Sequence, residues 1–323
     1  MHRKPPEAAR TEAQPTEVDR AEVSARLPIS VTVSGVKRLF GDDLSQLIGF
    51  AKRAEDAGVA QIAMTDHLAI GSRTDRYPYG TFPFPNDEPW PEPLLTLAAI
   101  AGATSRIRLA TAVLIAPLRP ALLLAKSLAT LDALSGGRVD LGVGVGWQTE
   151  EFAASGVPFE ARAARMDDVL RACRVLWRDA PASFHSPTLS FDDLWCIPRP
   201  VQPGGVPIWF GVALTPRNVA RVVEMGVGWV PVGSDVSALA DGVRTLRAAF
   251  TAAGRDPATL GVRANVPIAV GADGRVDLDR SIAEGIPRVR EAGATIAAFP
   301  IAAFVRDARG LDAFLARMRA LQP

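Results

Sequence analysis

The chain has 323 residues, of which 48% are hydrophobic and 22% charged, a balance typical of a globular protein with enough apolar material for a large core. Its 36 basic and 35 acidic residues give a net charge of +1, which offers no electrostatic basis for binding nucleic acid or an anionic membrane. The two cysteines, Cys173 and Cys196, form no CxxC pair and favour a reducing compartment.

The first 26 residues are polar, charged and proline-containing. They lack the apolar segment of a signal peptide, and no later segment reaches the length of a membrane span. We therefore expect a disordered N-terminal tail over residues 1–26, one domain over residues 27–323, and a cytoplasmic protein with no membrane partner.

From Pro28 onward, strand-like and helix-like segments alternate. Apolar β-branched runs predict the strands, and amphipathic spacing with glycine or capping residues at the ends predicts the helices. The predicted strand–helix pairs are 29–35 with 42–58, 59–67 with 92–105, 107–115 with 120–137, 138–146 with 165–178, 206–212 with 215–226, 227–233 with 235–254, 262–270 with 278–293, and 294–300 with 308–320.

This repeat favours a single (β/α)8 TIM barrel. Eight consecutive units fit such a barrel, and several strands are apolar on both faces, as parallel strands covered by helices should be. A doubly wound sheet is the alternative, but it rarely needs so many consecutive units.

Two long segments interrupt the repeat, one after the second strand (residues 66–92) and one before the fifth (residues 182–206). Connections of this length are commonly functional lids or disordered segments. The first is too aromatic for plain disorder, so we expect it to fold over a ligand. Its aromatic residues are Tyr77, Tyr79, Phe82, Phe84 and Trp90.

The stretch LGVGVGW, residues 141–147, has a glycine at every second position. A dinucleotide-binding loop requires G-x-G-x-x-G at the start of a helix, and Trp147 occupies the place of its last glycine. We interpret residues 139–146 as a strand instead. Its glycines share one face, where another backbone or a ligand ring can come close.

In barrels of this kind the active site lies at the carboxyl ends of the strands. Those ends are mostly small and apolar here, which suits a flat uncharged ring better than a metal ion, and we expect no metal site. His67, at the end of the second strand, can exchange a proton near neutral pH; the alternative is a histidine that only supports the long loop. Asp66 is expected to orient that loop or the imidazole.

Two further groups of polar residues allow both a functional and a structural interpretation. The segment Gly211-Val212-Ala213, with Thr215 and Arg217, could hold a phosphate at a helix N-terminus, or it could be an ordinary helix start. Glu150 and Glu151 lie close in the sequence to Arg162 and Arg165, and we interpret them as structural ion pairs rather than catalytic acids.

Taken together, these segments resemble the luciferase-like monooxygenase superfamily, and within it the coenzyme F420-dependent oxidoreductases. The resemblance covers about residues 28–320. It is strongest in QIAMTDH, IRLATAVLIAPLRPALLLAKSLATLDALSGGRVDLGVGVGWQTEEF and PIWFGVALTPRNVARVVEMGVGWVP.

The resemblance implies a role for each strand end. The family's histidine beside the reactive carbon of the deazaflavin falls on His67, after Asp66. The bulge against the ring, often with a non-prolyl cis peptide, falls on Ala112, Val113 and Leu114. The wall of the ring and substrate pocket falls on Val145, Gly146 and Trp147, with Tyr77, Tyr79 and Phe82 above it. The phosphate-holding loop falls on Gly211, Val212 and Ala213, followed by Thr215 and Arg217.

The chain also departs from the family pattern. Trp147 stands where sugar-phosphate dehydrogenases of the family carry a glutamate acid, so that substrate and its proton donor are not expected. Val145 replaces a hydroxyl residue of some relatives. Residues 211–214 read GVAL, whereas many family members have a glycine pair and a polar residue in this loop. The expected phosphate contacts are therefore weaker.

The resemblance therefore predicts an oxidoreductase that transfers a hydride between coenzyme F420 and a small organic substrate. A two-component monooxygenase that uses reduced FMN and oxygen is the alternative, and a flavin-binding protein without turnover is a third possibility. Family members commonly dimerise, so we also expect a homodimer.

Overall fold

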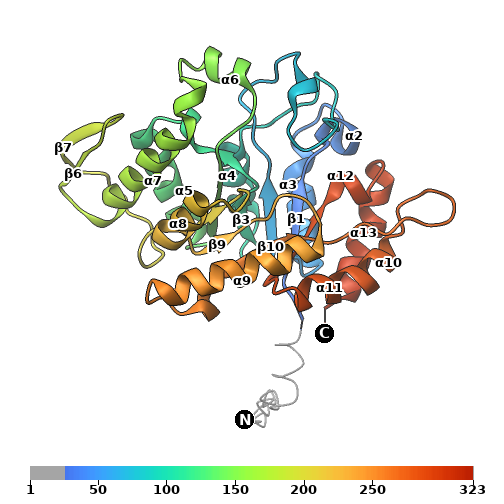
Figure 1. Cartoon of the computed structure of the whole chain (residues 1–323). Helices are drawn as coiled ribbons and strands as arrows, with labels where there is room; N and C mark the ends of the chain where they lie inside the picture. The colour runs from blue at the N-terminus through green and yellow to red at the C-terminus, as the bar shows by residue number, and fades with distance from the viewer. Residues whose placement is uncertain (1–25, 323) are drawn as a thin grey trace, which may run out of the picture.

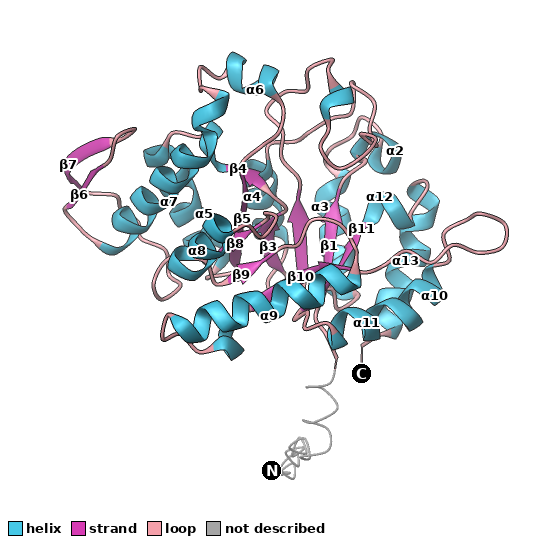
Figure 2. Ribbon diagram, in the orientation of Figure 1, coloured by secondary structure: helices cyan, strands magenta, loops and turns pink. Residues whose placement is uncertain are grey.

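The computed structural model describes residues 26–322 and shows a closed barrel of parallel strands surrounded by helices (Figures 1 and 2). The barrel strands, in chain order, are β1 (Ile29–Val33), β2 (Gln61–Met64), β3 (Arg108–Thr111), β4 (Leu114–Ile115), β5 (Val139–Gly144), β8 (Ile208–Phe210), β9 (Gly228–Trp229), β10 (Gly261–Asn265) and β11 (Ile296–Pro300). β4 continues the line of β3, and both pair with β5, so the ring closes with eight strand positions. The predicted (β/α)8 barrel is confirmed.

The helices lie outside the strands. They are α2 (Val36–Phe40), α3 (Gln46–Asp56), α4 (Pro93–Ala103), α5 (Ala121–Ser135), α6 (Thr149–Ala154), α7 (Arg162–Arg178), α8 (Pro216–Met225), α9 (Val236–Ala252), α10 (Leu278–Arg280), α11 (Ile286–Glu291), α12 (Ile301–Phe304) and α13 (Ala308–Ala320). Side-chain caps explain several starts: Glu92 accepts from Leu95 N before α4, and Asp235 accepts from two backbone N–H groups before α9.

The barrel interior is filled by one large ring at its lower end and by polar side chains above it. Trp209 of β8 occupies the space beside two glycines. An added Cβ would come within 2.2 Å of its ring at Gly228 and within 2.4 Å at Gly261. These strand glycines therefore make room for a tryptophan rather than for a turn.

A buried hydrogen-bond network crosses the same interior. Ser30 Oγ donates to Gln61 Oε1 (2.8 Å), and Gln61 Nε2 donates to Asp140 Oδ2 (2.8 Å). Arg108 donates to both oxygens of Asp140, each at 2.7 Å. The network joins β1, β2, β3 and β5, and it satisfies polar groups that burial would otherwise leave unpaired.

Several predicted boundaries differ from the structure. The segment 182–206, expected to be irregular, contains an antiparallel hairpin of β6 (Ala182–His185) and β7 (Ser190–Leu194), which projects at the left of Figure 1. The predicted strand 262–270 ends at Asn265, because Pro267 follows and cannot donate to a strand ladder. The predicted strand 107–115 is broken between Thr111 and Leu114.

The long segment 66–92 is confirmed as a connection without strands, with one 3-10 turn at Thr74–Arg76. It lies with α6 at the carboxyl end of the barrel, the top of Figure 1, whereas β1 begins at the opposite end. The expected tail over residues 1–26 lies outside the described residues except for Arg26, whose Nη1 donates to Leu321 O (2.9 Å). None of the helices in residues 26–322 has the length and apolar character that a membrane span requires.

Candidate active site at the carboxyl end of the barrel

A bulge in the third strand position forms one wall of the site. Ala110 pairs with Asp140, but Leu114 pairs with Val143, so three residues of β3–β4 lie opposite two of β5. The peptide bond Ala112–Val113 within this bulge is cis, as the family resemblance implies.

The glycines of the LGVGVGW stretch accommodate this bulge. A Cβ on Gly142 would lie 2.0 Å from Thr111 O, and one on Gly144 would lie 2.6 Å from Val113 Cγ2. A Cβ on Gly211, in the loop after β8, would lie 2.5 Å from Val113 Cγ1. The space left by Gly142 and Gly144 is therefore occupied by β3 and by Val113, not directly by a ligand, and Val113 is held at the barrel mouth between two glycines.

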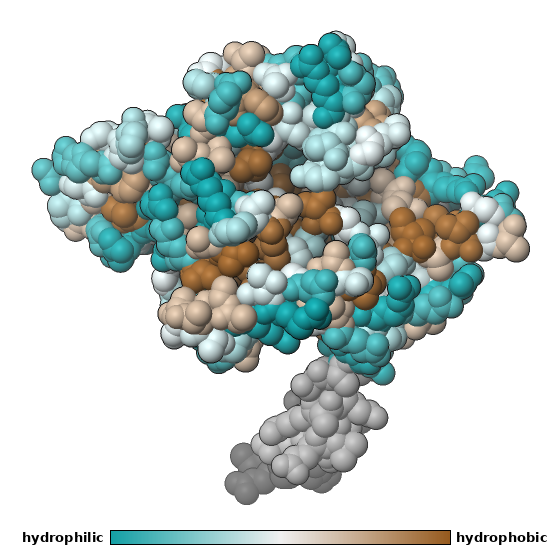
Figure 3. Space-filling model, in the orientation of Figure 1, coloured by the Kyte–Doolittle hydropathy of each residue, from teal (hydrophilic) through white to brown (hydrophobic). Residues whose placement is uncertain are grey.

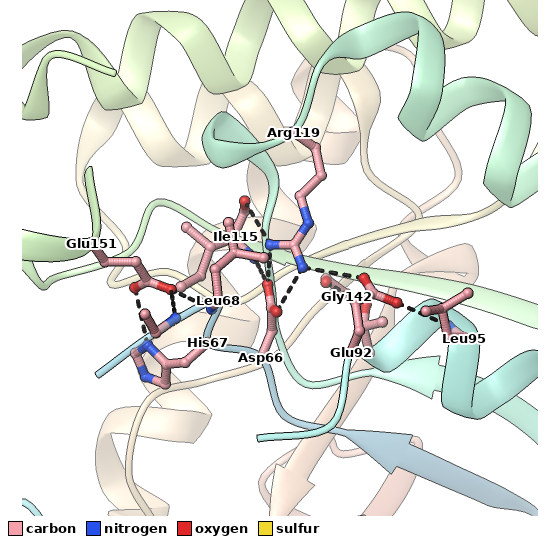
Figure 4. Close-up of polar contacts among 11 residues, drawn as sticks. Asp66, His67, Leu68, Glu92, Leu95, Ile115, Arg119, Gly142 and Glu151 are labelled. Atoms are coloured by element: carbon pink, nitrogen blue, oxygen red, sulfur yellow. Dashed lines mark hydrogen bonds and ion pairs between the residues drawn. The ribbon is translucent and has the colours of Figure 1, made fainter. Parts of the chain in front are cut away.

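Asp66 anchors the bulge from the neighbouring strand. Its fully buried carboxylate accepts from Ile115 N at 2.8 Å and forms a two-pronged ion pair with Arg119, with Nη2 donating to Oδ1 at 2.7 Å (Figure 4). Burial acts to lower the pKa of Arg119, but the hydrogen bonds and charges of Asp66 and Glu92 outweigh it and raise that pKa. Asp66 thus connects the end of β2 to β4 and to the turn before α5, and no hydrogen bond joins it to the imidazole of His67.

His67 is held by Glu151, which comes from α6. Nδ1 of His67 lies 3.0 Å from Glu151 Oε2, and Glu151 Oε1 accepts from Leu68 N at 2.5 Å (Figure 4). The side chains are 8% and 1% exposed, respectively. Because a carboxylate only accepts, Nδ1 carries the donated proton and Nε2 is the nitrogen free for exchange at the cavity.

The predicted ion pairs of Glu150 and Glu151 with Arg162 and Arg165 are wrong. α6 turns Glu151 toward β2, while Arg165 donates to a backbone carbonyl, Pro117 O, at 2.8 Å. Arg162 lies over the ring of Phe159 at 3.7 Å. Proximity in sequence misled here, because both glutamates face the segment 66–92: Glu150 lies 3.8 Å from Arg76, and Glu151 contacts His67.

Aromatic side chains of the segment 66–92 cover the histidine. We call Tyr77, Tyr79, Phe82, Phe84 and Trp90 the aromatic lid. The Trp90 ring lies 4.8 Å from the imidazole of His67, and Tyr77 and Phe82 lie 5.2 and 5.5 Å from the ring of Trp147. Such edge and tilted contacts stabilise an aromatic cluster beyond the area it buries. Burial also raises the pKa of the Tyr77 hydroxyl, which is therefore neutral in this lid.

A second side chain, besides Glu151, fixes the base of this loop. Gln148, 1% exposed, accepts from Gly71 N at 2.8 Å and donates to Gly71 O at 3.2 Å. Its amide pairs with the loop backbone as a neighbouring strand would. The loop is therefore fastened to the start of α6 at two points, at His67 by Glu151 and at Gly71 by Gln148.

Between the bulge and the lid lies a central cavity of about 350 Å³. Figure 3 shows apolar side chains gathered around a hollow at the centre of this face. The predicted site residues that line the cavity are Asp66, His67, Tyr77, Tyr79, Phe82, Ala112, Val113, Val145, Gly146, Trp147 and Gly211. A side cavity of about 420 Å³ adjoins it and shares the segment 231–233 and Asn265.

The other predicted residues are placed elsewhere. Leu114 and Val212 are buried and line neither cavity, whereas Ala213 lines the side cavity. Thr215 accepts from Asn218 N at 3.3 Å as the cap of α8. Arg217 is 66% exposed and lies 3.6 Å from Asp167. The structure therefore does not bring Thr215 and Arg217 to either cavity, and their phosphate contacts stay a prediction.

Sequence reasoning missed Thr32 and Thr65 of the cavity wall, and with them two polar residues of β10, Arg263 and Asn265. They stand two residues apart and so share the inward face of the strand. The available signal was an arginine and an asparagine at alternate positions of an otherwise apolar strand. Within residues 26–322, no three His, Cys, Asp or Glu side chains gather as a metal site would require.

The family model of the luciferase-like monooxygenases matches residues 21–305. The chain belongs to the luciferase-like monooxygenase family. An uncharacterized protein of Mycobacterium tuberculosis is 36% identical over 214 residues, covering 64% of this chain and 74% of that protein.

Luciferase-like relatives differ in their cofactor. An F420-dependent hydroxymycolic acid dehydrogenase of M. tuberculosis is 32% identical over 232 residues, covering 71% of this chain and 60% of that enzyme. An FMNH2-dependent dimethylsulfone monooxygenase of Pseudomonas putida is 36% identical over 107 residues, covering 32% of this chain and 29% of that enzyme. The family thus contains both F420-dependent oxidoreductases and FMN-dependent monooxygenases.

Solved luciferase-like structures share the barrel. The coenzyme F420-dependent tetrahydromethanopterin reductase of Methanopyrus kandleri has a TM-score of 0.69 at 16% identity, covering 88% of this chain and 96% of that one. A long-chain alkane monooxygenase has a TM-score of 0.72 at 15% identity, covering 90% and 89%. At these identities the likeness concerns the fold alone.

Proposed function

We propose that the chain is an oxidoreductase that transfers a hydride between coenzyme F420 and a small organic substrate in the central cavity. The observation that carries this proposal is His67, which is held by Glu151 at the cavity wall beneath the aromatic lid. Of the two enzymes described above, the F420-dependent dehydrogenase matches 71% of this chain and the FMNH2-dependent monooxygenase matches 32%.

The residues present fit a flat heterocycle. Val113, seated between Gly144 and Gly211, gives the cavity an apolar wall against which a ring can lie. Trp90 Nε1 is buried at the cavity without a hydrogen-bond partner in the described chain, so the lid has a free donor for a ring carbonyl or nitrogen. When bound, a deazaflavin supplies or accepts the hydride at a ring carbon.

The chain's own residues bind, orient and move a proton. The bulge and the aromatic lid form the walls of the cavity. A flat cofactor and its substrate are held between these walls and shielded from water, which positions the reacting groups. His67 exchanges the substrate proton through Nε2, while Glu151 keeps Nδ1 protonated and the ring in place. Asp66 acts through the backbone of β4, not on the substrate.

An FMNH2-dependent monooxygenase is the second candidate, and one observation favours it. The side cavity is lined by Asp235 and Asp241 and by no lysine, arginine or histidine of the described chain. A long anionic tail such as that of F420 needs basic contacts, whereas FMN needs a single phosphate site.

Titration of the purified protein with F420 and with FMN, in oxidised and reduced forms, tests the choice of cofactor. We expect tighter binding of F420 and turnover with it; tighter binding of reduced FMN with oxygen consumption supports the second candidate. Binding without turnover over a panel of substrates supports a flavin-binding protein.

The role of His67 is tested separately in single turnovers. His67→Ala should slow the proton-coupled step about 100- to 10,000-fold and leave cofactor affinity nearly unchanged. His185→Ala is the matched control, because that histidine is 62% exposed on the β6–β7 hairpin. Equal rates for His67→Ala and the control contradict the role.

A further inference from the structure

The described chain buries four arginines, and three of them are fully engaged by the protein. Arg119 and Arg221 form ion pairs with Asp66 and Asp167. Arg138 has no carboxylate partner, but its three nitrogens donate five hydrogen bonds to neighbouring oxygens at 2.7–3.0 Å. These three side chains have the saturated surroundings expected of structural arginines.

The fourth, Arg263 of β10, is different. It is 3% exposed and lines the central cavity. Its Nε donates to Ser30 Oγ at 3.0 Å and its Nη2 donates to Thr32 Oγ1, both neutral acceptors. It forms no ion pair within residues 26–322, and Nη1 donates to no atom of that part of the chain. One edge of a buried guanidinium is therefore left for another partner.

Burial without a counter-charge is unfavourable for a cation. Burial lowers the pKa of Arg263 to about 10, against the opposing charge of Asp140, which Arg108 already occupies. The side chain is still charged at neutral pH. An anion in the central cavity removes this unfavourable situation, because it supplies the missing charge and the missing acceptor together.

The position of Arg263 in the ring of strands shows which part of the cavity it serves. In the strand order, β10 lies four positions from β3 in both directions, so it faces the bulge across the barrel. Ser30 and Thr32 are alternate residues of β1, and Thr32 is the nearer of the two to the carboxyl end. The guanidinium of Arg263 donates to both, so it extends toward the barrel mouth. A molecule between Val113 and Arg263 has an apolar wall on one side and a cation on the other.

We propose that Arg263 is the anion-binding residue of the central cavity, and that its Nη1 edge takes a charged oxygen on a flat, largely apolar molecule. Two sources share this chemistry: the carboxylate of an aromatic substrate, and the anionic O–C–N edge of a reduced flavin-type ring. The second source rests on the proposed function, while the first does not.

Binding of matched probes to the purified protein tests the proposal. Calorimetry compares benzoate with neutral benzamide, and reduced with oxidised FMN. The wild-type protein should prefer the anionic member of at least one pair by roughly 10- to 100-fold, as expected for a hydrogen bond to a charged group. A preference for benzoate identifies a substrate carboxylate, and a preference for reduced FMN identifies the ring. The proposal is overturned if the wild-type protein prefers the anion in neither pair. It is also overturned if the preference persists in the Arg263→Met variant.

Benzoate binding is independent of any cofactor. Failure of F420 to bind in the titration described above overturns the proposed function and leaves the comparison of benzoate with benzamide standing.

Thermal unfolding separates a ligand-binding arginine from a structural one. Arg263→Met removes an uncompensated buried charge, so its midpoint should equal or exceed that of the wild-type protein. Arg138→Met, the matched control, should lower the midpoint and leave the anion preference unchanged, because five acceptors lose their donor. A midpoint for Arg263→Met as low as that of the control shows a structural role and overturns the proposal. Arg263→Lys, which keeps the charge, should retain part of the preference.

Discussion

The Glu151 carboxylate determines which nitrogen of His67 carries the proton, and Glu151→Gln should reverse that arrangement. Glu151 accepts from His67 Nδ1 at 3.0 Å and from Leu68 N at 2.5 Å. Leu68 N still needs an acceptor in the variant, so the glutamine oxygen stays on that side. The amide NH2 then faces Nδ1, which must accept, and the imidazole proton moves to Nε2.

The magnitude follows from these two hydrogen bonds. A hydrogen bond to a carboxylate stabilises the folded state by about 1.5–3 kcal/mol, and one between neutral groups by about 0.5–1.5 kcal/mol. Glu151→Gln should therefore lower the free energy of unfolding by about 2 kcal/mol. Glu151→Ala leaves the Leu68 N–H without an acceptor and should lower it by about 3–5 kcal/mol, as when one partner of a buried charged pair is removed.

The tautomer is directly measurable by 15N NMR of the imidazoles, because the chain has only three histidines. His67→Asn identifies the signal, and urea unfolding gives the free energy. Glu150→Gln is the matched control: that side chain is 36% exposed, lies 3.8 Å from Arg76, and should change stability by less than about 0.5 kcal/mol. An unchanged His67 tautomer in Glu151→Gln, or a stability equal to that of the control, would refute this reasoning.

Further predictions concern the bulge, acid stability and self-association. Gly142→Ala places a Cβ 2.0 Å from a carbonyl of β3 and should destabilise by more than about 4 kcal/mol in urea, whereas Gly102→Ala in α4, with open space, should stabilise by about 0.5–1 kcal/mol. Burial acts to raise the pKa of Glu55, but hydrogen bonds from backbone N–H groups lower it below 4.5. Its stabilisation is present above pH 4.5 and lost as pH falls through the folded-state pKa, so the destabilisation of Glu55→Gln should shrink in acid. Leu95 and Leu123 are 74% and 60% exposed beside a groove between α4 and α5, where we propose that a second copy docks. Sedimentation should show a wild-type dimer and a monomeric Leu95→Asp/Leu123→Asp variant; a wild-type monomer contradicts this.

The barrel was predictable because its signal is repeated along the chain. Each strand–helix unit carries its own periodicity, so an error at one boundary, such as that at Pro267, does not change the topology. The aromatic lid was predictable from composition for a related reason: a 27-residue connection rich in large rings must bury them against something.

The polar details depend on contacts between distant segments and were not predictable. Glu151 is close to Arg162 in sequence, but α6 turns it toward His67, 84 positions earlier. The glycines at 142 and 144 signalled a close approach, yet only the structure shows that Thr111 O approaches Gly142 and that Val113 approaches Gly144. Arg263 was not singled out in the predicted strand 262–270, because alternation over five residues cannot show which face lines a cavity.

The pairing of Gln148 with both backbone groups of Gly71 divides the loop into two parts that are held in different ways. The part before Gly71, which carries His67, belongs mechanically to the barrel. The aromatic part after it is held by ring contacts and by polar contacts of its own, from Arg76 to Thr149 and Glu150 and from Lys37 N to Glu88. For the proposed reaction, substitutions in the aromatic lid should therefore alter how fast a molecule enters or leaves, while the position of His67 depends on Glu151.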